Sequence, residues 1–182
     1  MKKIIAIAGR KGAGKDTIAE VLTDKGFVVV KFAGALKTMF RAYLQYVGAG
    51  EYIIERMIEG DLKEVPSPLL QGKTPRFFMQ RLGTEFGRDM IGDDLWVDAL
   101  EHHCSTIPDD IAITDMRFPN EGDKAGDMGA EKWRVRRPSI KLDDTSDHPS
   151  ETAIDDLEVD VDFLNVGSIE DLKNLAEDTL NE

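Results

Sequence analysis

A glycine-rich stretch near the start of the chain constrains the fold most strongly. Residues 9–17 read Gly-Arg-Lys-Gly-Ala-Gly-Lys-Asp-Thr and follow an apolar run at residues 4–8. The next segment places Ile18, Val21 and Leu22 on one helical face. A strand, a Gly-x-x-x-x-Gly-Lys loop and a helix in this order are typical of a phosphate-binding loop, because glycine lets successive backbone N–H groups point at phosphate oxygens. The sequence therefore predicts a phosphorylated ligand.

The residues of this loop have distinct expected roles. Lys15 is expected to reach the β- and γ-phosphates of a nucleotide and to act in catalysis. Such loops usually continue with Ser or Thr, whose hydroxyl binds Mg²⁺, but here Asp16 follows the lysine and Thr17 comes next. Asp16 and Thr17 are therefore the candidate metal ligands in the loop. The residues predicted to bind the nucleotide are Gly9, Arg10, Lys11, Gly12, Ala13, Gly14, Lys15, Asp16 and Thr17.

Charge is distributed unevenly along the 182 residues, which carry a net charge of −12. Residues 1–41 hold nine Lys/Arg against three Asp/Glu, whereas residues 138–182 hold two against fourteen. Binding to nucleic acid relies on basic side chains that neutralise phosphates, so we expect no nucleic-acid partner. The basic surplus around the loop suits a small phosphorylated ligand, and the acidic segment is expected to be solvated surface.

Compartment and membrane contact can be predicted from cysteine and apolar content. Cys104 is the single cysteine, which excludes an internal disulfide and fits a reducing compartment. The sequence has no apolar run of membrane-spanning length, and residues 1–3 lead directly into the first strand, so we expect no targeting segment. The expected location is the cytoplasm, with no membrane partner.

Alternating strand and helix patterns predict an α/β fold. Strands are expected at residues 3–8, 27–32, 111–115, 131–137 and 159–166. Helices are expected at residues 14–24, after residue 35, near 51–59, at 76–88, at 93–104 and after Ser168. The first strand, helix and strand imply a right-handed parallel crossover, which indicates a parallel sheet.

The expected helix at 76–88 combines an apolar stripe with an arginine-bearing face. Phe78, Met79, Leu82 and Phe86 recur at core spacing, and Arg81, Thr84 and Arg88 share another face. This face is either a solvated surface or a clamp for phosphoryl groups. Gly83 costs about 1 kcal/mol relative to Ala in mid-helix, which suggests close approach of a ligand or partner.

The end of the third expected strand supplies an acidic group. Asp115 follows four uncharged residues, and Arg117 comes two residues later in the loop. In phosphate-loop enzymes an Asp in this place positions Mg²⁺, so Asp115 is a third candidate metal ligand. We expect Asp115, Arg117 and Glu121 to face one crevice, because ligands bind beyond the carboxyl ends of parallel strands. The alternative is an ordinary strand end with a capping aspartate.

Three further features have two interpretations each. Lys37 lies just after the second strand, where it could touch a ligand or remain a solvated lysine on an amphipathic helix. Trp96 is either core or a platform on which a base stacks. His102, His103 and Cys104 are not expected to hold a metal, since adjacent residues of a helix do not face each other.

Several of these segments together resemble the phage deoxynucleoside monophosphate kinases of the P-loop kinase superfamily. The resemblance rests, in order, on the loop at 9–17 with its Lys-Asp-Thr, on Met-Gln-Arg-Leu-Gly-Thr-Glu at 79–85, on Trp96, on Thr-Asp-Met-Arg-Phe-Pro-Asn-Glu at 114–121, and on Arg137-Pro138 with a later Asp-His-Pro-Ser-Glu. Asp16 after the lysine is typical of this family. The matches extend over most of the chain.

The resemblance implies transfer of the γ-phosphoryl group of ATP to a deoxynucleoside 5′-monophosphate, with Mg²⁺. It implies a three-layer P-loop kinase fold: a five-stranded parallel sheet flanked by helices, with acceptor-binding and lid segments. The expected single domain has a core of residues 1–32, 108–137 and 158–182, an acceptor-binding region at 33–107 and a lid-like loop at 138–157. A homodimer is possible.

By the same resemblance, Arg137 would join the ATP site as the lid closes. Lys15, Arg81, Asp115 and Arg117 are the expected catalytic residues. The acceptor site would be lined by Lys37, Arg81, Gly83, Thr84, Arg88, Trp96, Asp115, Arg117 and Glu121. Two rival functions remain open: a kinase of another small acceptor, such as a dephospho-coenzyme or a sugar acid, and a nucleotide-binding protein without catalysis.

Overall fold

The computed structural model describes residues 2–138 and 153–181, and these form two compact units. The first, called the sheet unit, comprises Met1–Phe32 and Leu100–Glu182. The second, called the helical unit, is Ala33–Ala99. Most of the loop predicted as a lid, residues 139–152 with His148, lies outside the described residues.

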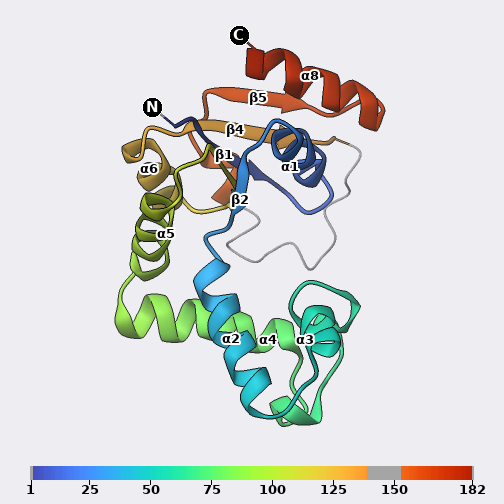
Figure 1. Cartoon of the computed structure of the whole chain (residues 1–182), viewed down its shortest axis with the longest axis vertical. Coiled ribbons are helices and arrows are strands. Elements are labelled where there is room, and N and C mark those ends of the chain that lie inside the picture. The colour runs from blue at the N-terminus through green and yellow to red at the C-terminus, as the bar shows by residue number, and fades with distance from the viewer. Residues whose placement is uncertain (1, 139–152, 182) are drawn as a thin grey trace. The chain divides into compact units, whose positions relative to one another are not determined.

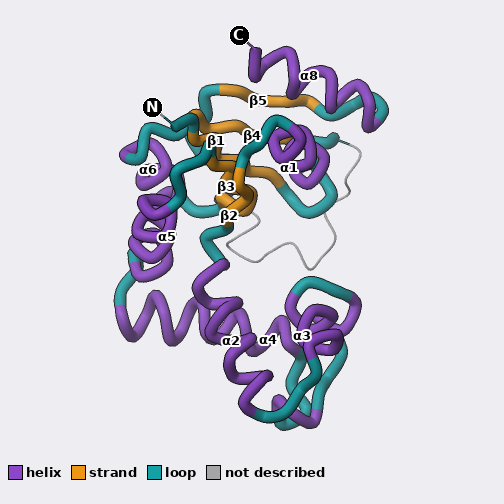
Figure 2. The backbone as a smooth tube through the Cα atoms, in the orientation of Figure 1, coloured by secondary structure: helices purple, strands orange, loops and turns teal. Residues whose placement is uncertain are grey.

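The sheet unit is built on five parallel strands in the order β2-β3-β1-β4-β5 (Figures 1 and 2). The predicted five-stranded parallel sheet and the α/β class are confirmed. β1 occupies the centre because its apolar residues are buried on both faces, as a sheet covered on both sides requires. The strands are β1 Ile4–Gly9, β2 Val28–Val30, β3 Ile111–Met116, β4 Glu131–Arg136 and β5 Val161–Leu164.

Two helices cover one face of this sheet, α1 Lys15–Asp24 and α8 Ile169–Asn181. Their buried side chains, such as Leu22 and Leu172, pack with those of the strands, such as Ile7, in one apolar cluster. This packing fixes α1, and with it the loop that precedes α1, against β1. The helix α6 Pro119–Asp127 packs against β4 and begins with proline, which tolerates the first helical turn.

The helical unit has its own core. Phe40 and Leu44 of α2 Gly34–Tyr46 pack with Ile54 of α3 Glu51–Ile58 and Met79 of α4 Pro75–Arg81. The Phe40 ring stacks on Phe78 with centroids 4.7 Å apart. The remaining elements of the unit are the 3₁₀ turns Asp61–Glu64 and Pro68–Leu70, a π-helix at Leu82–Ile91 and the start of α5 Leu95–Thr106.

The π-helix departs from the sequence prediction. The periodicity at 76–88 predicts one α-helix with Phe86 on its buried stripe, but α4 ends at Arg81 and Phe86 is 38% exposed. A π-helix bonds residue i to i+5, so positions after residue 82 rotate away from the face that 3.6-residue spacing assigns them. The predicted burial is therefore confirmed for Met79 and wrong for Phe86.

Among the described residues, no helix is long and apolar enough to cross a membrane.

Candidate active site

The loop between β1 and α1 is a tight turn that needs glycine. Ala13 N donates to Arg10 O at 3.1 Å, which closes the turn, and Gly14 takes φ +118° at the start of α1. A Cβ on Gly9 would lie 2.7 Å from Val135 O, and a Cβ on Gly14 would lie 2.6 Å from Leu172 Cδ2. The neighbouring elements thus leave no room for side chains at either position.

Lys15 folds back across this loop. Its Nζ donates to Gly9 O at 2.5 Å and to Arg10 O at 3.0 Å. The ammonium group therefore lies at the start of the loop, beside the carbonyls of the last residue of β1 and of the residue that follows it. A lysine held here places a positive charge where loop N–H groups and the amino end of α1 already favour anions.

A pocket of about 410 Å³ adjoins the loop. It brings together six residues predicted to bind ATP: Gly12, Gly14, Lys15, Asp16, Thr17 and Arg137. The pocket also includes residues that the sequence analysis did not select, all from the segment after β5 and the start of α8: Asn165, Gly167, Ser168, Ile169 and Leu172. A signal for these residues was present, since a small and polar Asn-x-Gly-Ser segment follows the last strand.

The segment after β5 is held by its own hydrogen bonds. Ser168 N and Oγ each donate to Asp171 Oδ2 at 2.8 Å, and Asp171 N donates back to Ser168 Oγ at 3.1 Å. The backbone bond from Ser168, followed by its side-chain bond, lowers the pKa of the Asp171 carboxyl below its ordinary value. This reciprocal pairing caps α8 and confirms the helix start predicted at Ser168.

The two basic residues at the start of the loop lie differently. Arg10 lines a separate pocket of about 290 Å³ with Arg136, and its guanidinium pairs with Asp155. Lys11 is exposed. Gly9 is walled in by Val135 O, and Ala13 is buried beside the smaller pocket. Four of the predicted ATP-binding residues, Gly9, Arg10, Lys11 and Ala13, therefore do not line the larger pocket.

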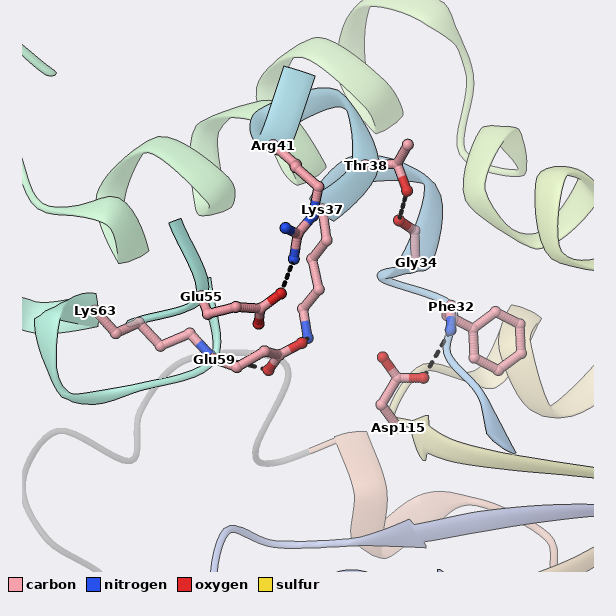
Figure 3. A network of polar contacts seen from close by, with 9 residues as sticks. All are labelled: Phe32, Gly34, Lys37, Thr38, Arg41, Glu55, Glu59, Lys63 and Asp115. Atoms are coloured by element: carbon pink, nitrogen blue, oxygen red, sulfur yellow. Dashed lines mark hydrogen bonds and ion pairs between the residues drawn. The ribbon is translucent and has the colours of Figure 1, made fainter. Parts of the chain in front are cut away.

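Asp115 sits at the carboxyl end of β3 and is half-buried. Its Oδ1 accepts a hydrogen bond from Phe32 N at 2.7 Å, as Figure 3 shows. The carboxylate thus ties the end of β3 to the chain just beyond β2. This bond matches the interpretation of Asp115 as a residue that caps a strand end.

Glu121 has a buried carboxylate, with the residue only 4% exposed. Its Oε2 accepts from Arg117 N at 2.7 Å and from Phe118 N at 3.1 Å. Glu121 therefore fixes the turn between β3 and α6, and the backbone of Arg117 with it. A charged acceptor for two backbone donors at a helix start is a strong local constraint.

The donor set near the loop suits Mg²⁺. Asp16 and Thr17 both border the larger pocket and offer a carboxylate and a hydroxyl, the hard oxygen ligands that Mg²⁺ prefers. In the described ranges 2–138 and 153–181, no three His, Cys, Asp or Glu side chains gather as a metal site. Mg²⁺ usually keeps waters and binds through one or two carboxylates together with phosphates, so a sparse protein set is what a nucleotide-bound ion needs.

Two charged candidates of the helical unit, Lys37 and Arg81, are paired with carboxylates. Lys37 Nζ donates to Glu59 Oε1 at 2.6 Å, and Lys63 Nζ lies 4.0 Å from the other oxygen of Glu59, as drawn in Figure 3. Arg81 pairs with Glu85 one turn on, and its guanidinium lies 5.2 Å from the Phe77 ring centroid. These side chains form ion pairs at the surface of the helical unit.

Three further candidates lie on or beside the π-helix. Arg88 Nη1 donates to Asp93 O at 3.4 Å, and Thr84 is exposed. A Cβ on Gly83 would have Leu36 Cδ2 as its nearest described neighbour, at an ordinary 3.5 Å. The close approach predicted at Gly83 thus has no counterpart within the described chain, and a ligand there stays a prediction.

Trp96 belongs to the interior of the helical unit. It is 5% exposed, and its Nε1 donates to Gly83 O at 2.8 Å. A Cβ built on Gly87 would overlap the indole ring, so it is Gly87 that must be glycine. The indole thus stabilises the π-helix, which agrees with the core interpretation of Trp96.

Comparisons with known proteins place this geometry in a family. A family model described as deoxynucleotide monophosphate kinase matches residues 71–175, which is more than half of the chain. A protein of Acanthamoeba polyphaga mimivirus, whose name assigns it to the deoxynucleotide monophosphate kinases, is 30% identical over 184 residues and is covered to 91%, with 92% of this chain. The deoxynucleoside-5′-monophosphate kinase of Escherichia phage T5 is 38% identical over 87 residues, 44% of this chain and 35% of that protein.

Solved structures share the fold at low identity. A dephospho-CoA kinase from Campylobacter jejuni superposes with a TM-score of 0.57 at 14% identity, covering 100% of this chain and 97% of that chain. TT1252 from Thermus thermophilus gives 0.54 at 18% identity, covering 99% and 97%. These likenesses support the P-loop kinase fold and carry nothing about substrate.

Proposed function

The chain belongs to the deoxynucleotide monophosphate kinase family, and on that premise we propose that it transfers the γ-phosphoryl group of ATP to deoxynucleoside 5′-monophosphates. The products are ADP and the deoxynucleoside diphosphate. The observation that carries the proposal is the loop at 9–17. The ammonium of Lys15 lies at the start of this loop, and a pocket of about 410 Å³ beside the loop has room for the phosphates of a nucleotide. The family relationship favours this acceptor over a dephospho-coenzyme or a sugar acid.

The loop is the proposed donor site. The backbone N–H groups of Gly12, Gly14 and Lys15 and the amino end of α1 bind the β- and γ-phosphates of ATP, while the N–H of Ala13 closes the turn. Lys15 exchanges its contacts with the loop carbonyls for phosphate oxygens, which offer it a full opposite charge. Arg137, at the border of the same pocket, supports the nucleotide.

Mg²⁺ is the proposed metal, with Asp16, Thr17 and Asp115 as its predicted ligands. When bound, the ion neutralises charge on the donor phosphates. The carboxylate of Asp16 and the hydroxyl of Thr17 border the loop pocket and supply oxygen ligands directly or through water. The Oδ1 bond to Phe32 N orients Asp115 for the same role.

The acceptor needs alignment more than proton removal. A monophosphate oxygen is already anionic near neutral pH, so the protein must place it in line with the donor and offset the charge on the moving group. We assign this to Arg81 and Arg117, assisted by Lys37 and Arg88, with Gly83 and Thr84 beside them. The buried positions of Glu121 and Trp96 favour support of Arg117 and of the π-helix, respectively, over direct contact with the acceptor.

The wider setting follows from the sequence. We propose that the chain acts as one kinase domain with a core of 1–32, 108–137 and 158–182, an acceptor-binding region at 33–107 and a lid at 138–157 that excludes water on closure. A cytoplasmic location and a homodimer remain predictions. Gel filtration with light scattering would decide the second.

Activity measurements test the proposal. The purified protein with Mg-ATP is expected to convert deoxynucleoside monophosphates to diphosphates, followed by ADP release and by chromatography of the products. The panel of acceptors includes dephospho-CoA and a sugar acid, and turnover confined to one of those would overturn the assignment. ATP binding without turnover on any acceptor would instead favour the non-catalytic alternative.

Replacing the loop lysine tests the site. Lys15→Ala is expected to lower kcat by about 10³-fold or more, because it removes a positive charge aimed at the transferring group. Lys25→Ala is the matched control, since Lys25 follows the opposite end of α1 in a surface ion pair with Glu177. Its activity should stay near that of the unaltered protein. Full turnover by Lys15→Ala would remove the loop from the mechanism.

A further inference from the structure

At the end of β5 the usual burial preference is reversed: the polar residue Asn165 is buried and its apolar neighbours are exposed. Leu164 and Val166 are apolar and 51% and 74% exposed, whereas Asn165 between them is polar and 8% exposed. Apolar groups are usually the buried ones, and a buried polar side chain requires a hydrogen-bond partner. The buried amide of Asn165 must therefore make a hydrogen bond that offsets the cost of burying it in place of its apolar neighbours.

That contact is with the phosphate loop. Asn165 Nδ2 donates to Ala13 O at 2.8 Å, and its own backbone N donates to Arg136 O at 2.7 Å. The backbone bond extends the β4–β5 ladder by one residue and fixes the position of the side chain. The amide thus links a rigid sheet position to a loop that lies 152 residues away in sequence.

The loop needs such support because glycine is freer than any other residue. Gly12 and Gly14 flank Ala13, and both adopt positive φ. Asn165 Nδ2 and Leu172 Cδ2 would lie 2.9 and 2.6 Å from a Cβ on Gly14, so these two side chains press against the loop from outside. Leu172 supplies contact only, while the amide of Asn165 also sets an orientation.

Orientation matters because a peptide unit is planar. The carbonyl of Ala13 and the N–H of Gly14 belong to the same unit and point in opposite directions. When Asn165 holds the carbonyl, it also directs the N–H of Gly14 to the other side of the loop. This N–H is one of the donors expected to meet the phosphates.

We propose that Asn165 is a positioning residue for ATP: its side-chain amide holds the Ala13–Gly14 peptide so that the loop N–H groups are preorganised for the phosphates. The proposal rests on the proposed function. It predicts a defect specific to the nucleotide donor, since none of the proposed acceptor contacts involves this peptide. A residue that merely filled space beside Leu172 would have no such specificity.

Asn165→Leu is the first variant, because it keeps a similar volume and removes the donor. Titration calorimetry with Mg²⁺ and an ATP analogue carrying a non-hydrolysable β–γ bridge should show about tenfold weaker binding, the size expected for loss of one hydrogen bond and the order it maintains. In steady-state assays KM for ATP should rise by a similar factor, with KM for the deoxynucleoside monophosphate within about twofold of the unaltered protein.

Phe163→Leu is the control for stability. Phe163 is 2% exposed on β5 and packs against the Trp133 ring, so its truncation loosens the same strand while the amide of Asn165 that donates to Ala13 O is kept. Its melting temperature should fall while ATP binding of the folded protein is retained. Equal losses of ATP binding in Phe163→Leu and Asn165→Leu would mean that Asn165 acts only through stability, and would overturn the proposal.

Asn165→Asp gives a pH readout and an independent variant should the leucine variant fail to fold. An ionised Asp cannot donate to Ala13 O, but a protonated one can, and burial raises the pKa of a carboxyl group. The ATP affinity of Asn165→Asp, relative to that of the unaltered protein, should rise as the pH falls from 8 to 5. At pH 5 it should exceed the relative affinity of Asn165→Leu. Relief of charge repulsion alone would bring it only to the leucine level.

The outcomes separate the two proposals. No ATP binding by the unaltered protein overturns the proposed function and this inference with it. ATP binding and turnover that are unchanged by Asn165→Leu, or an Asn165→Asp variant without recovery at low pH, overturn the role of Asn165 alone.

Discussion

The two units hold their candidate functional residues by different means. In the sheet unit, Asp115, Glu121 and Asn165 each bond to the backbone of a distant or neighbouring turn. In the helical unit, Lys37 and Arg81 pair with carboxylate side chains at the surface. Bonds to backbone fix a loop in one conformation, whereas surface ion pairs contribute about 0–1 kcal/mol and exchange readily.

This difference suggests a division of labour. The proposed donor half is preorganised before the nucleotide binds, because the groups that hold it are part of the fold. In the proposed acceptor half, by contrast, Lys37 and Arg81 are paired with Glu59 and Glu85, and these ion pairs must open before the cations can bind a phosphate. A kinase that binds ATP in a rigid loop and gathers a smaller acceptor with long cationic side chains fits this contrast. Four substitutions can break or sharpen it.

The largest effect is expected from Glu121→Ala in the sheet unit. It removes a buried charged acceptor from two backbone donors, and hydrogen bonds to charged groups contribute about 1.5–3 kcal/mol each. The free energy of unfolding should fall by about 2–4 kcal/mol in urea denaturation, and kcat should fall because the backbone of Arg117 loses its anchor. Asp123→Ala, on the exposed face of the same helix, is the control. A loss no greater than that of the control would show that the turn does not depend on Glu121.

An intermediate effect is expected from a pair of glycine substitutions in the helical unit. Gly87→Ala would drive a methyl group into the Trp96 indole, and overpacking of this kind costs about 1–3 kcal/mol. Gly83→Ala meets only Leu36 Cδ2 at 3.5 Å, so its stability should be unchanged or up to about 1 kcal/mol higher. Thermal unfolding of the two variants side by side measures the difference.

The same pair tests the acceptor prediction. If a ligand approaches Gly83 closely, Gly83→Ala will raise KM for the monophosphate despite its unimpaired stability. An unchanged KM would instead remove Gly83 from the acceptor contacts and leave Gly87 as the glycine that matters.

The smallest effect is expected from Glu59→Gln. The Lys37–Glu59 pair is partly exposed, with side-chain exposures of 19% and 44%, so its loss should change stability by less than about 1 kcal/mol. In the wild-type chain the Glu59 carboxylate competes with the acceptor phosphate for the ammonium of Lys37. When this carboxylate is removed, KM for the monophosphate should fall about two- to threefold at low salt. The difference should shrink at high ionic strength, because salt screens exposed charges.

Glu20→Gln is a matched control for this substitution, since Glu20 forms a similar surface pair with Lys173 in the sheet unit. It should leave KM for both substrates unchanged. A higher KM in Glu59→Gln would reverse the interpretation: Glu59 would then orient Lys37 for the phosphate rather than compete with it.

Much of the fold followed from local sequence patterns. The order of strands and helices, the parallel sheet and the phosphate loop are each specified by neighbouring residues: apolar runs, glycine spacing and helical periodicity. The π-helix at Leu82–Ile91 did not follow, because its register depends on how the Trp96 indole packs on Gly87 and bonds to Gly83 O. Spacing rules assume 3.6 residues per turn and cannot anticipate that contact.

The candidate site divides in the same way. Gly9, Gly14 and Lys15 lie within one short stretch, so the sequence alone was enough to predict a phosphate-binding loop between the first strand and the first helix. Asn165 could be found only in the folded protein, because it meets Ala13 across 152 residues through the pairing of β4 with β5. The sequence determined the loop pattern from which the chemistry is predicted, and tertiary structure decided which residue holds that loop in place, since a hydrogen bond between distant segments exists only after the sheet has brought them together.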